Sequence, residues 1–166
     1  INPGLYSGAT GHHFARPGNR FWPALHRAGF TPRQLHPSEE RELLAYGVGM
    51  SKLVARATAT AAELTEEELR LGGMRVRRQV KKYAPRAVCF LGVGAYCSAY
   101  GLKKAAIGRH EGDFAGAQLW VLPNPSGLNA NYQMPDFVRL FSELREAVGS
   151  TRGRGARGGG RDGGTA

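Results

Sequence analysis

Residues 85–100 read PRAVCFLGVGAYCSAY, and at their centre lies a compact apolar run, AVCFL, at 87–91. A run of this length between Pro85 and Gly92 is typical of a strand buried inside a sheet. The residues that follow, 92–100, predict a tight turn leading into a helix. A strand that passes directly into a helix is the building unit of α/β folds, so this stretch indicates the fold class.

Similar segments alternate on both sides of this unit. Strands are predicted at 50–54 and 118–122, and helices at 19–30, from Ser38 onward, at 65–83 and at 136–148. The helix at 65–83 has the clearest start, because Thr65 and Glu68 match a capping box. This order predicts a three-layer α/β/α fold with a short, mainly parallel central sheet.

The composition narrows the class of protein. A length of 166 residues and 42% apolar content indicate one globular domain, which we place at 1–148. No apolar run is long enough for a membrane span, and no signal-peptide pattern is present, so we expect a cytoplasmic protein that is not secreted. The 23 Lys and Arg outnumber the 13 Asp and Glu, and the resulting net charge of +10 favours a polyanionic partner.

The tail at 149–166 has a composition of its own, with eight glycines, four arginines and no large apolar side chain. Such a segment cannot bury enough surface to offset the entropy of ordering it, so we expect it to be disordered. Two roles stay open for it: a solvated terminus, or an arm that adds loose phosphate contacts.

Two turn-rich loops are expected at the carboxyl edge of the sheet, where α/β folds bind ligands. The opening loop, INPGLYSGATGHHF at 1–14, offers the amide of Asn2, several glycines and the flat ring of Phe14. An amide, backbone donors and an aromatic face suit a planar heterocycle such as a nucleobase. The alternative is an ordinary connector.

The second loop, at 124–132, places Leu128 between Gly127 and Asn129. An apolar side chain on a polar loop can serve as a wedge inserted into a base stack, where it supports a flipped-out nucleotide. The alternative is that Leu128 packs back onto the core.

Other patterns are weaker. The GVGAY turn at 92–96 lacks the full dinucleotide-binding pattern, although a nucleotide-binding α/β protein remains an alternative. His12, His13 and the two cysteines lack the spacing of zinc ligands, so we expect no metal site. The basic run at 75–82 is usually a solvated helix face, and a phosphate-facing role stays open.

Taken together, the motifs resemble those of the mismatch-specific uracil-DNA and thymine-DNA glycosylase family. The opening INPG at 1–4 is similar to the family's GINPG motif, and it is followed by Phe14 and by NRFW at 19–22. The second loop begins NPSGL at 124–128, like the family's insertion loop. Weaker similarity runs through 49–54 and 72–73.

The resemblance implies a uracil-DNA glycosylase fold and cleavage of the N-glycosidic bond of uracil, or of a related damaged pyrimidine, in double-stranded DNA. Asn2 matches the catalytic residue, and backbone donors around His13 and Phe14 would stabilise the departing base. The implied base pocket contains Ile1, Ser7, His13, Phe14, Lys52 and Asn124. Leu128 matches the wedge, and Gly127 and Asn129 match the contacts to the opposite base. A monomer without cofactor is expected, and a non-catalytic nucleic-acid-binding module of the same fold is the alternative.

Two departures from the family carry expectations. The family has an apolar strand before INPG, whereas this chain begins at Ile1, so the first strand looks truncated and we expect this chain to fold poorly. Ala130 stands where the family often has an arginine, which would remove one DNA contact.

Overall fold

The computed structural model describes residues 1, 2 and 4–150, so most of the predicted disordered tail lies outside the described residues. Its helices are α1 (Leu5–Thr10), α2 (Phe21–Arg27), α3 (Glu66–Tyr83), α4 (Val93–Tyr100) and α5 (Met134–Ser150), with 3₁₀ helices η1 (Pro37–Tyr46) and η2 (Ala61–Glu63). The strands are β1 (Ala87–Leu91), β2 (Gly108–Phe114) and β3 (Ala117–Leu122). α5 continues to Ser150, two residues beyond the expected end of the domain at 148.

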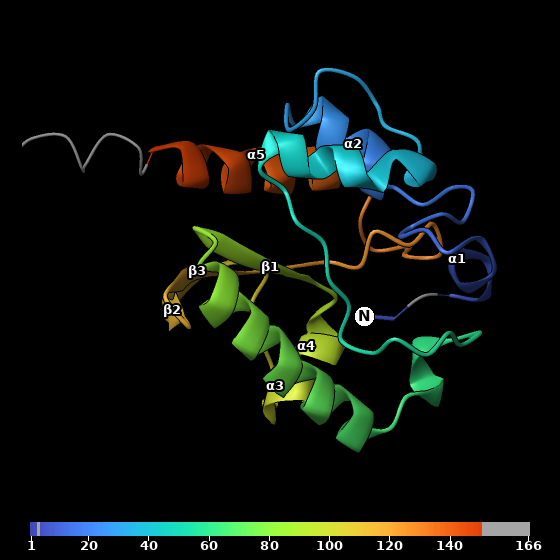
Figure 1. The fold of residues 1–166 in the computed structure, drawn as a ribbon, viewed down its shortest axis with the longest axis vertical. Helices are drawn as coiled ribbons and strands as arrows, with labels where there is room; N and C mark the ends of the chain where they lie inside the picture. The colour runs from blue at the N-terminus through green and yellow to red at the C-terminus, as the bar shows by residue number, and fades with distance from the viewer. Residues whose placement is uncertain (3, 151–166) are drawn as a thin grey trace, which may run out of the picture.

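The central sheet has the order β1-β3-β2 (Figure 1). β1 and β3 are parallel in continuous register, from Ala87 opposite Gln118 to Leu91 opposite Leu122. β2 is antiparallel to β3 and was not predicted. The hairpin that joins them turns through Ala115 and Gly116, whose positive φ angles of 53° and 91° suit a two-residue turn.

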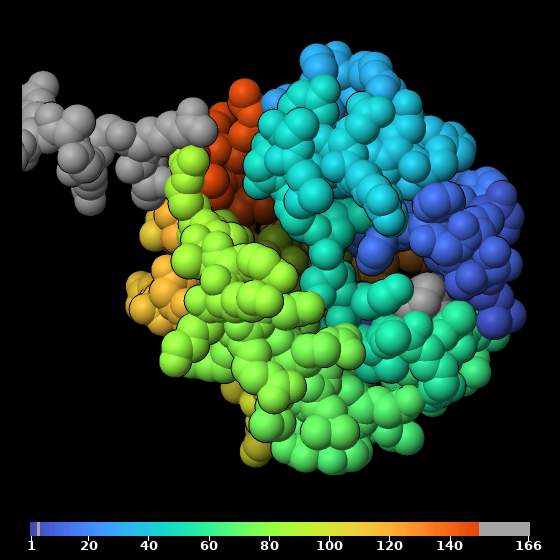
Figure 2. Space-filling view, viewed as in Figure 1, coloured from blue at the N-terminus to red at the C-terminus, as the bar shows by residue number. Residues whose placement is uncertain are grey.

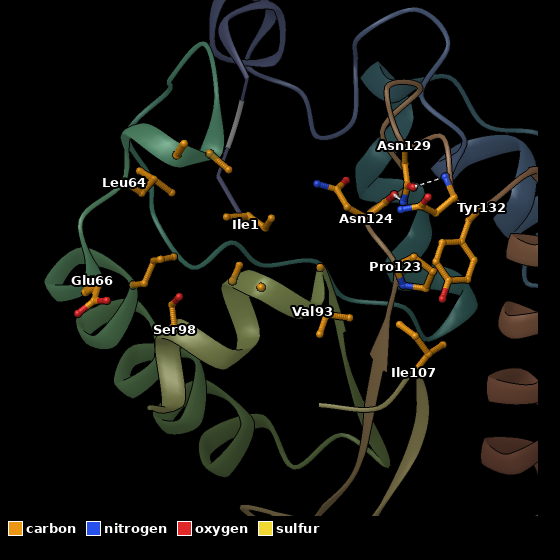
Figure 3. Close-up of a pocket in the computed structure, with 17 residues that line it drawn as sticks. Ile1, Leu64, Glu66, Val93, Ser98, Ile107, Pro123, Asn124, Asn129 and Tyr132 are labelled. Carbon is orange, nitrogen blue, oxygen red and sulfur yellow. Dashed lines mark hydrogen bonds between the residues drawn. The ribbon is translucent and has the colours of Figure 1, made fainter. Parts of the chain in front are cut away.

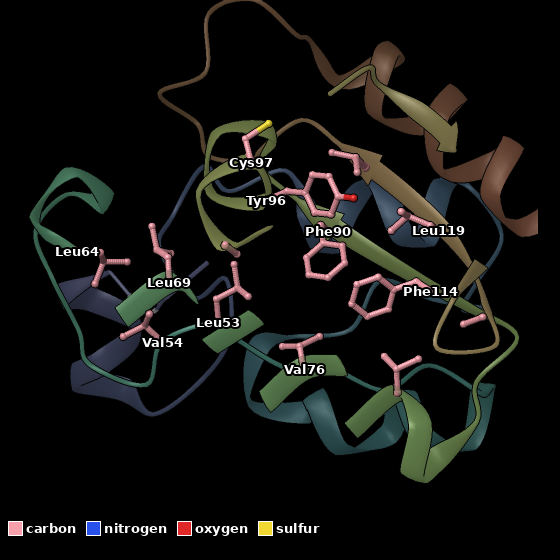
Figure 4. Packing of buried hydrophobic residues seen from close by; sticks show 14 residues of the cluster. Leu53, Val54, Leu64, Leu69, Val76, Phe90, Tyr96, Cys97, Phe114 and Leu119 are labelled. Carbon is pink, nitrogen blue, oxygen red and sulfur yellow. The ribbon is translucent and has the colours of Figure 1, made fainter. Parts of the chain in front are cut away.

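Helices cover both faces of this sheet, which confirms the predicted three-layer fold. Side chains alternate along the strands, so Phe90, Leu119 and Val121 pack with α3 and α4 on one face (Figure 4). Trp120 and Leu122 pack with α2 and α5 on the other face. Because both faces of β1 and β3 are covered, these strands read as continuous apolar runs.

The predicted boundaries of α3 are confirmed by its caps. The Thr65 hydroxyl accepts a hydrogen bond from the Glu68 amide at 3.1 Å, and the Glu68 carboxylate accepts one from the Thr65 amide at 2.8 Å. The helix ends at Ala84, whose φ of 46° turns the chain just before Pro85. This helix is amphipathic and buries Leu69, Val76 and Val80 against the sheet.

The strand predicted at 50–54 is absent from the described residues. Instead the segment is irregular, and its backbone groups bond to other parts of the molecule. Arg75 Nη2 donates to the carbonyls of Lys52 and Leu53 at 2.7 and 2.8 Å, and the Val54 amide donates to the Ile1 carbonyl at 3.0 Å. A single arginine therefore takes the place of a neighbouring strand.

β1 pairs with β3 along one edge, and among the described residues no strand pairs with its other edge. Accordingly Ala87, Val88, Cys89 and Leu91 are only half-buried. Within residues 1, 2 and 4–150, no helix has the length and apolar character needed to cross a bilayer.

Candidate active site

The two loops singled out in the sequence meet at the carboxyl ends of β1 and β3. Gly92 follows β1 directly, and its amide donates to the Leu122 carbonyl at the end of β3, at 2.8 Å. A Cβ on Gly92 would lie 2.9 Å from the Ile1 side chain and 4.0 Å from Asn124 Cβ. With a φ of 134° as well, this position requires glycine.

A cavity of about 580 Å³ opens at this edge. Figure 3 shows Asn124, Asn129 and Tyr132 on one side of it, Leu64, Glu66 and Ser98 on the other, and Ile1 between the two groups. Of the predicted site residues, Ile1, Asn124 and Asn129 line this cavity, whereas the others lie around it or elsewhere.

Asn2 is held by a loop that the sequence did not single out. Its Nδ2 donates to the Arg56 carbonyl at 2.9 Å and to the Thr58 hydroxyl at 2.8 Å. Thr58 is buried, and its own hydroxyl donates to the Thr60 carbonyl at 2.7 Å. A parallel bridge between Gly4 and Thr58 aligns the two segments. The amide group of Asn2 is therefore fixed in orientation before any ligand binds.

The loop that holds Asn2 is in turn attached to the start of α3. The Arg56 guanidinium donates to both carboxylate oxygens of Glu68, at 2.9 and 3.0 Å, and also to the Glu63 carbonyl. Hydrogen bonds from Arg56 and from the Thr65 amide hold the pKa of Glu68 at about 2. Glu68 thus caps the helix and anchors the segment that positions Asn2.

The opening segment is more ordered than the predicted loop, because residues 5–10 form α1. Ser7 is buried in this helix, and its hydroxyl accepts a hydrogen bond from the Ala15 amide at 3.0 Å. Phe14 has a φ of 51° and stacks on Phe21, with ring centroids 4.2 Å apart. The backbone here is folded tightly, and Phe14 extends an aromatic stack that begins in the core.

His13 is tied to Glu40 of η1. Its amide and its Nδ1 both contact Glu40 Oε2, at 2.8 and 2.9 Å. Burial opposes ionisation of Glu40, but these contacts outweigh it and lower the pKa of the carboxyl. The His13 amide, one of the backbone donors expected around His13 and Phe14, is therefore already bonded to Glu40. Within the described residues, His13 Nε2 is buried without a hydrogen-bond partner.

The second loop is rigidly built around its own side chains. The Asn124 carboxamide accepts from the Ser126 amide at 3.1 Å, and the Ser126 hydroxyl accepts from the Leu128 amide at 3.2 Å. Asn129 Nδ2 donates back to the Asn124 carbonyl at 3.0 Å. The Leu128 side chain is 74% exposed, so it does not pack onto the core.

Arg20 joins this loop to the opening segment, a role that nothing in its sequence pattern indicated. Its guanidinium donates to the Asn129 carbonyl at 2.9 Å, to the Gly127 carbonyl at 3.3 Å and to the Tyr132 carbonyl. Its own amide donates to the Pro125 carbonyl at 2.9 Å. Gly127 packs so closely that a Cβ would lie 2.8 Å from the Gly18 carbonyl oxygen. Arg20 therefore fixes the base of the Leu128 loop.

Lys52 lies apart from the cavity, on the irregular segment that crosses α3, and its side chain is half-buried. Its carbonyl accepts a hydrogen bond from Arg75 Nη2 at 2.7 Å. No group of three or more His, Cys, Asp and Glu that could hold a metal ion occurs among residues 1, 2 and 4–150.

The structure is that of an α/β protein with a cavity at the carboxyl edge of its sheet, an oriented amide and an exposed apolar loop. The chain matches the family model of the uracil DNA glycosylase superfamily over residues 1–148, and it belongs to this superfamily. Both loops lie inside the matched region. Membership of this superfamily gives the chain the general activity of a DNA glycosylase. A DNA glycosylase removes a base from DNA by hydrolysis during repair.

Proposed function

We propose that this protein is a monofunctional glycosylase that excises uracil, or a related damaged pyrimidine, from mismatches with guanine in double-stranded DNA. The observation that carries the proposal is the orientation of Asn2. Its Nδ2 donates to Arg56 and Thr58, and the neighbouring Ile1 lines the same cavity as Asn129 of the Leu128 loop. The protein acts as a monomer and leaves an abasic site.

The chemistry requires a water molecule aimed at C1′ of the flipped nucleotide. The Asn2 carboxamide orients this water, whose oxygen bonds to C1′ as the C1′–N1 bond breaks. The electron pair of the broken bond leaves with the base, which departs as an anion, and the proton that the attacking water loses passes to solvent. An amide is a poor proton acceptor, so the enzyme depends on leaving-group stabilisation and is expected to be slow. We assign this stabilisation to the backbone donors around Phe14, because the His13 amide and Nδ1 are already bonded to Glu40.

The Leu128 loop supplies the wedge and reads the opposite base. Leu128 enters the base stack at the position that the flipped nucleotide leaves. The Asn129 amide already donates to the Ser126 carbonyl, and the Gly127 and Asn129 carbonyls each accept from Arg20. A carbonyl oxygen has a second lone pair, which can accept from the N–H groups of guanine. Thymine or adenine in the opposite strand offers fewer donors, which favours guanine.

Excision from a panel of duplexes tests this proposal. Single-turnover reactions followed by alkali compare duplexes with one U·G, U·A or T·G pair. We expect uracil opposite guanine to be removed fastest. Equal excision rates for U·G and U·A would contradict recognition of guanine in the opposite strand. If the protein binds these duplexes but cleaves none of them, the non-catalytic nucleic-acid-binding module is favoured instead.

A further inference from the structure

The positive charge of this protein is concentrated in one part of the sequence. Residues 69–110 contain no Asp or Glu at all, whereas the rest of the chain has 13 acidic and 13 basic residues. The segment therefore has a charge of +10, which equals the net charge of the whole chain. Its ten basic residues are Arg70, Arg75, Arg77, Arg78, Lys81, Lys82, Arg86, Lys103, Lys104 and Arg109.

Five of these cations are exposed together at the amino edge of the sheet, and we call them the amino-edge surface: Arg77, Arg78, Lys81, Lys82 and Arg86. Two contacts fix this position. The Arg77 guanidinium lies 5.1 Å from the centroid of the Phe114 ring, beside the β2–β3 turn. Arg86 directly precedes β1 and donates to the Val148 carbonyl near the end of α5.

This edge lies opposite the candidate active site. β1 begins at Ala87, next to Arg86, and ends at Leu91, next to Gly92 and the cavity. Figure 2 shows the last turns of α3, in light green, on the far side of the molecule from the blue opening segment. One duplex held at the Leu128 loop would therefore not also cover this edge.

The charges of the amino-edge surface are not neutralised within the described residues. None of its five cations forms an ion pair there, whereas Arg33, Arg56, Arg70 and Arg139 each pair with a glutamate. Lys81 and Lys82 in the last turn of α3 also favour the helix dipole, but this does not account for Arg77, Arg78 or Arg86. One carboxylate lies near this edge, because Asp113 on β2 is opposite Gln118, whose amide donates to the Arg86 carbonyl.

We propose that the amino-edge surface binds the phosphodiester backbone of a second DNA segment, separate from the segment at the active site. Residues 78 and 82 are one helical turn apart, about 6 Å along α3, so their cations form a row suited to successive phosphates. Tyr83 is 71% exposed within this row, and an aromatic ring among cations is typical of nucleic-acid contacts. Binding of this kind is independent of sequence and lets the protein hold one DNA segment while it samples another.

Binding to unmodified duplex DNA at several salt concentrations tests the proposal without depending on excision. The variant Arg78→Gln/Lys81→Gln/Lys82→Gln is compared with Arg27→Gln/Arg41→Gln/Arg139→Gln, three exposed cations elsewhere. Both triple variants lower the net charge from +10 to +7. Thermal unfolding verifies that each variant is folded.

The amino-edge variant is expected to lose about tenfold or more in affinity at low salt. Its plot of log K against log salt should be shallower by about 2 to 3, the slope of three lost phosphate contacts. Sedimentation at low salt should detect two short duplexes per wild-type protein and one per variant. Equal losses in both triple variants, or a wild type that never binds a second duplex, would overturn the proposal. Loss of binding only to vesicles of phosphatidylserine and phosphatidylcholine would assign the surface to membranes instead.

Discussion

At the scale of single residues, the orientation of Asn2 depends on the buried hydroxyl of Thr58. Replacing Thr58 by Val keeps the shape but removes the acceptor for Asn2 Nδ2. Because a misoriented catalytic group costs about tenfold to 100-fold in rate, excision should slow by that factor while DNA binding changes little. Single-turnover kinetics measure the effect.

Thr58→Ser is the matched control, since it restores the hydroxyl. It should recover most of the wild-type rate. Equal slowing in Thr58→Val and Thr58→Ser would show that packing, not the hydrogen bond to Asn2, is responsible.

We expect Arg20 to affect base flipping and excision indirectly, by holding the Leu128 loop in position. Arg20→Lys keeps the charge but cannot reach three carbonyls at once, so the loop should lose its fixed position. We expect excision to slow by about tenfold. The fluorescence of 2-aminopurine placed beside the uracil, which reports base flipping, should fall to the level of Leu128→Ala.

Arg16→Lys is the control for Arg20, because Arg16 is exposed on the same segment. Arg16→Lys should flip the uracil nucleotide and excise uracil at the same rates as the wild type. A lower melting temperature for Arg20→Lys with normal flipping would limit Arg20 to a structural role.

Features that depend on a local sequence pattern could be anticipated from the sequence, whereas contacts between distant segments could not. The exposure of Leu128 could be anticipated, because an apolar side chain between Gly127 and Asn129 is unusual in a polar loop. Thr58 and Arg20 could not, because their contacts are made across 56 and more than 100 residues. The pairing of His13 with Glu40 is likewise a contact between distant segments, and it removed a backbone donor that the motif alone had offered.

At the scale of elements, α3 depends on a close approach to the 50–54 segment. A Cβ on Gly72 would lie 2.0 Å from the Leu53 carbonyl oxygen, a backbone atom that cannot move aside. Gly72→Ala should therefore lower the free energy of unfolding by about 3 kcal/mol, as overpacking does. Chemical denaturation measures it.

Gly94→Ala in α4 is the matched control, because a Cβ there meets nothing within 4 Å. It should leave stability unchanged or raise it by about 0.5 kcal/mol, since alanine favours a helix. A similar loss in both variants would contradict the close contact at Gly72.

The start of α3 is expected to be sensitive to acid. The pKa of Glu68 is lowered from 4.5 to about 2 by Arg56 and the Thr65 amide, so its charged form stabilises the folded protein above its ordinary pKa. That contribution is lost as the pH falls from about 4.5 towards 2. Over this range the melting temperature of the wild type should fall further than that of Glu68→Gln. Parallel curves would contradict the role of this ion pair.

The helices and strands that could be predicted each have a recognisable pattern within their own sequence. β1, β3 and α4 follow from apolar runs and a glycine turn, and α3 and α5 follow from amphipathic spacing and a cap. β2 reads GRHEGDF, and as an edge strand with one neighbour it needs few apolar residues. The 50–54 segment has the apolar pattern of a strand, but Arg75 and Ile1 bond to its backbone instead. Its structure depends on tertiary contacts that no local pattern contains.

At the scale of the whole molecule, the two edges of the sheet have different chemistry. The carboxyl edge has amides, backbone groups and one exposed leucine, which suits recognition of a base and its partner. The amino edge has exposed cations that form no ion pair within the described residues, which suits the DNA backbone. The three-layer fold keeps these two surfaces apart. Substitutions at one edge can therefore change base excision, and substitutions at the other can change the electrostatic attraction to DNA, independently of each other.

The most direct test of the account compares the wild type with Asn2→Ala on a duplex that contains one U·G pair. We expect the wild type to release uracil in single-turnover reactions and Asn2→Ala to do so at least about 100-fold more slowly, while both bind an abasic-site duplex. Release of uracil at the same rate by Asn2→Ala, or no release by a folded wild-type protein, would contradict the central claim that Asn2 directs hydrolysis at this site.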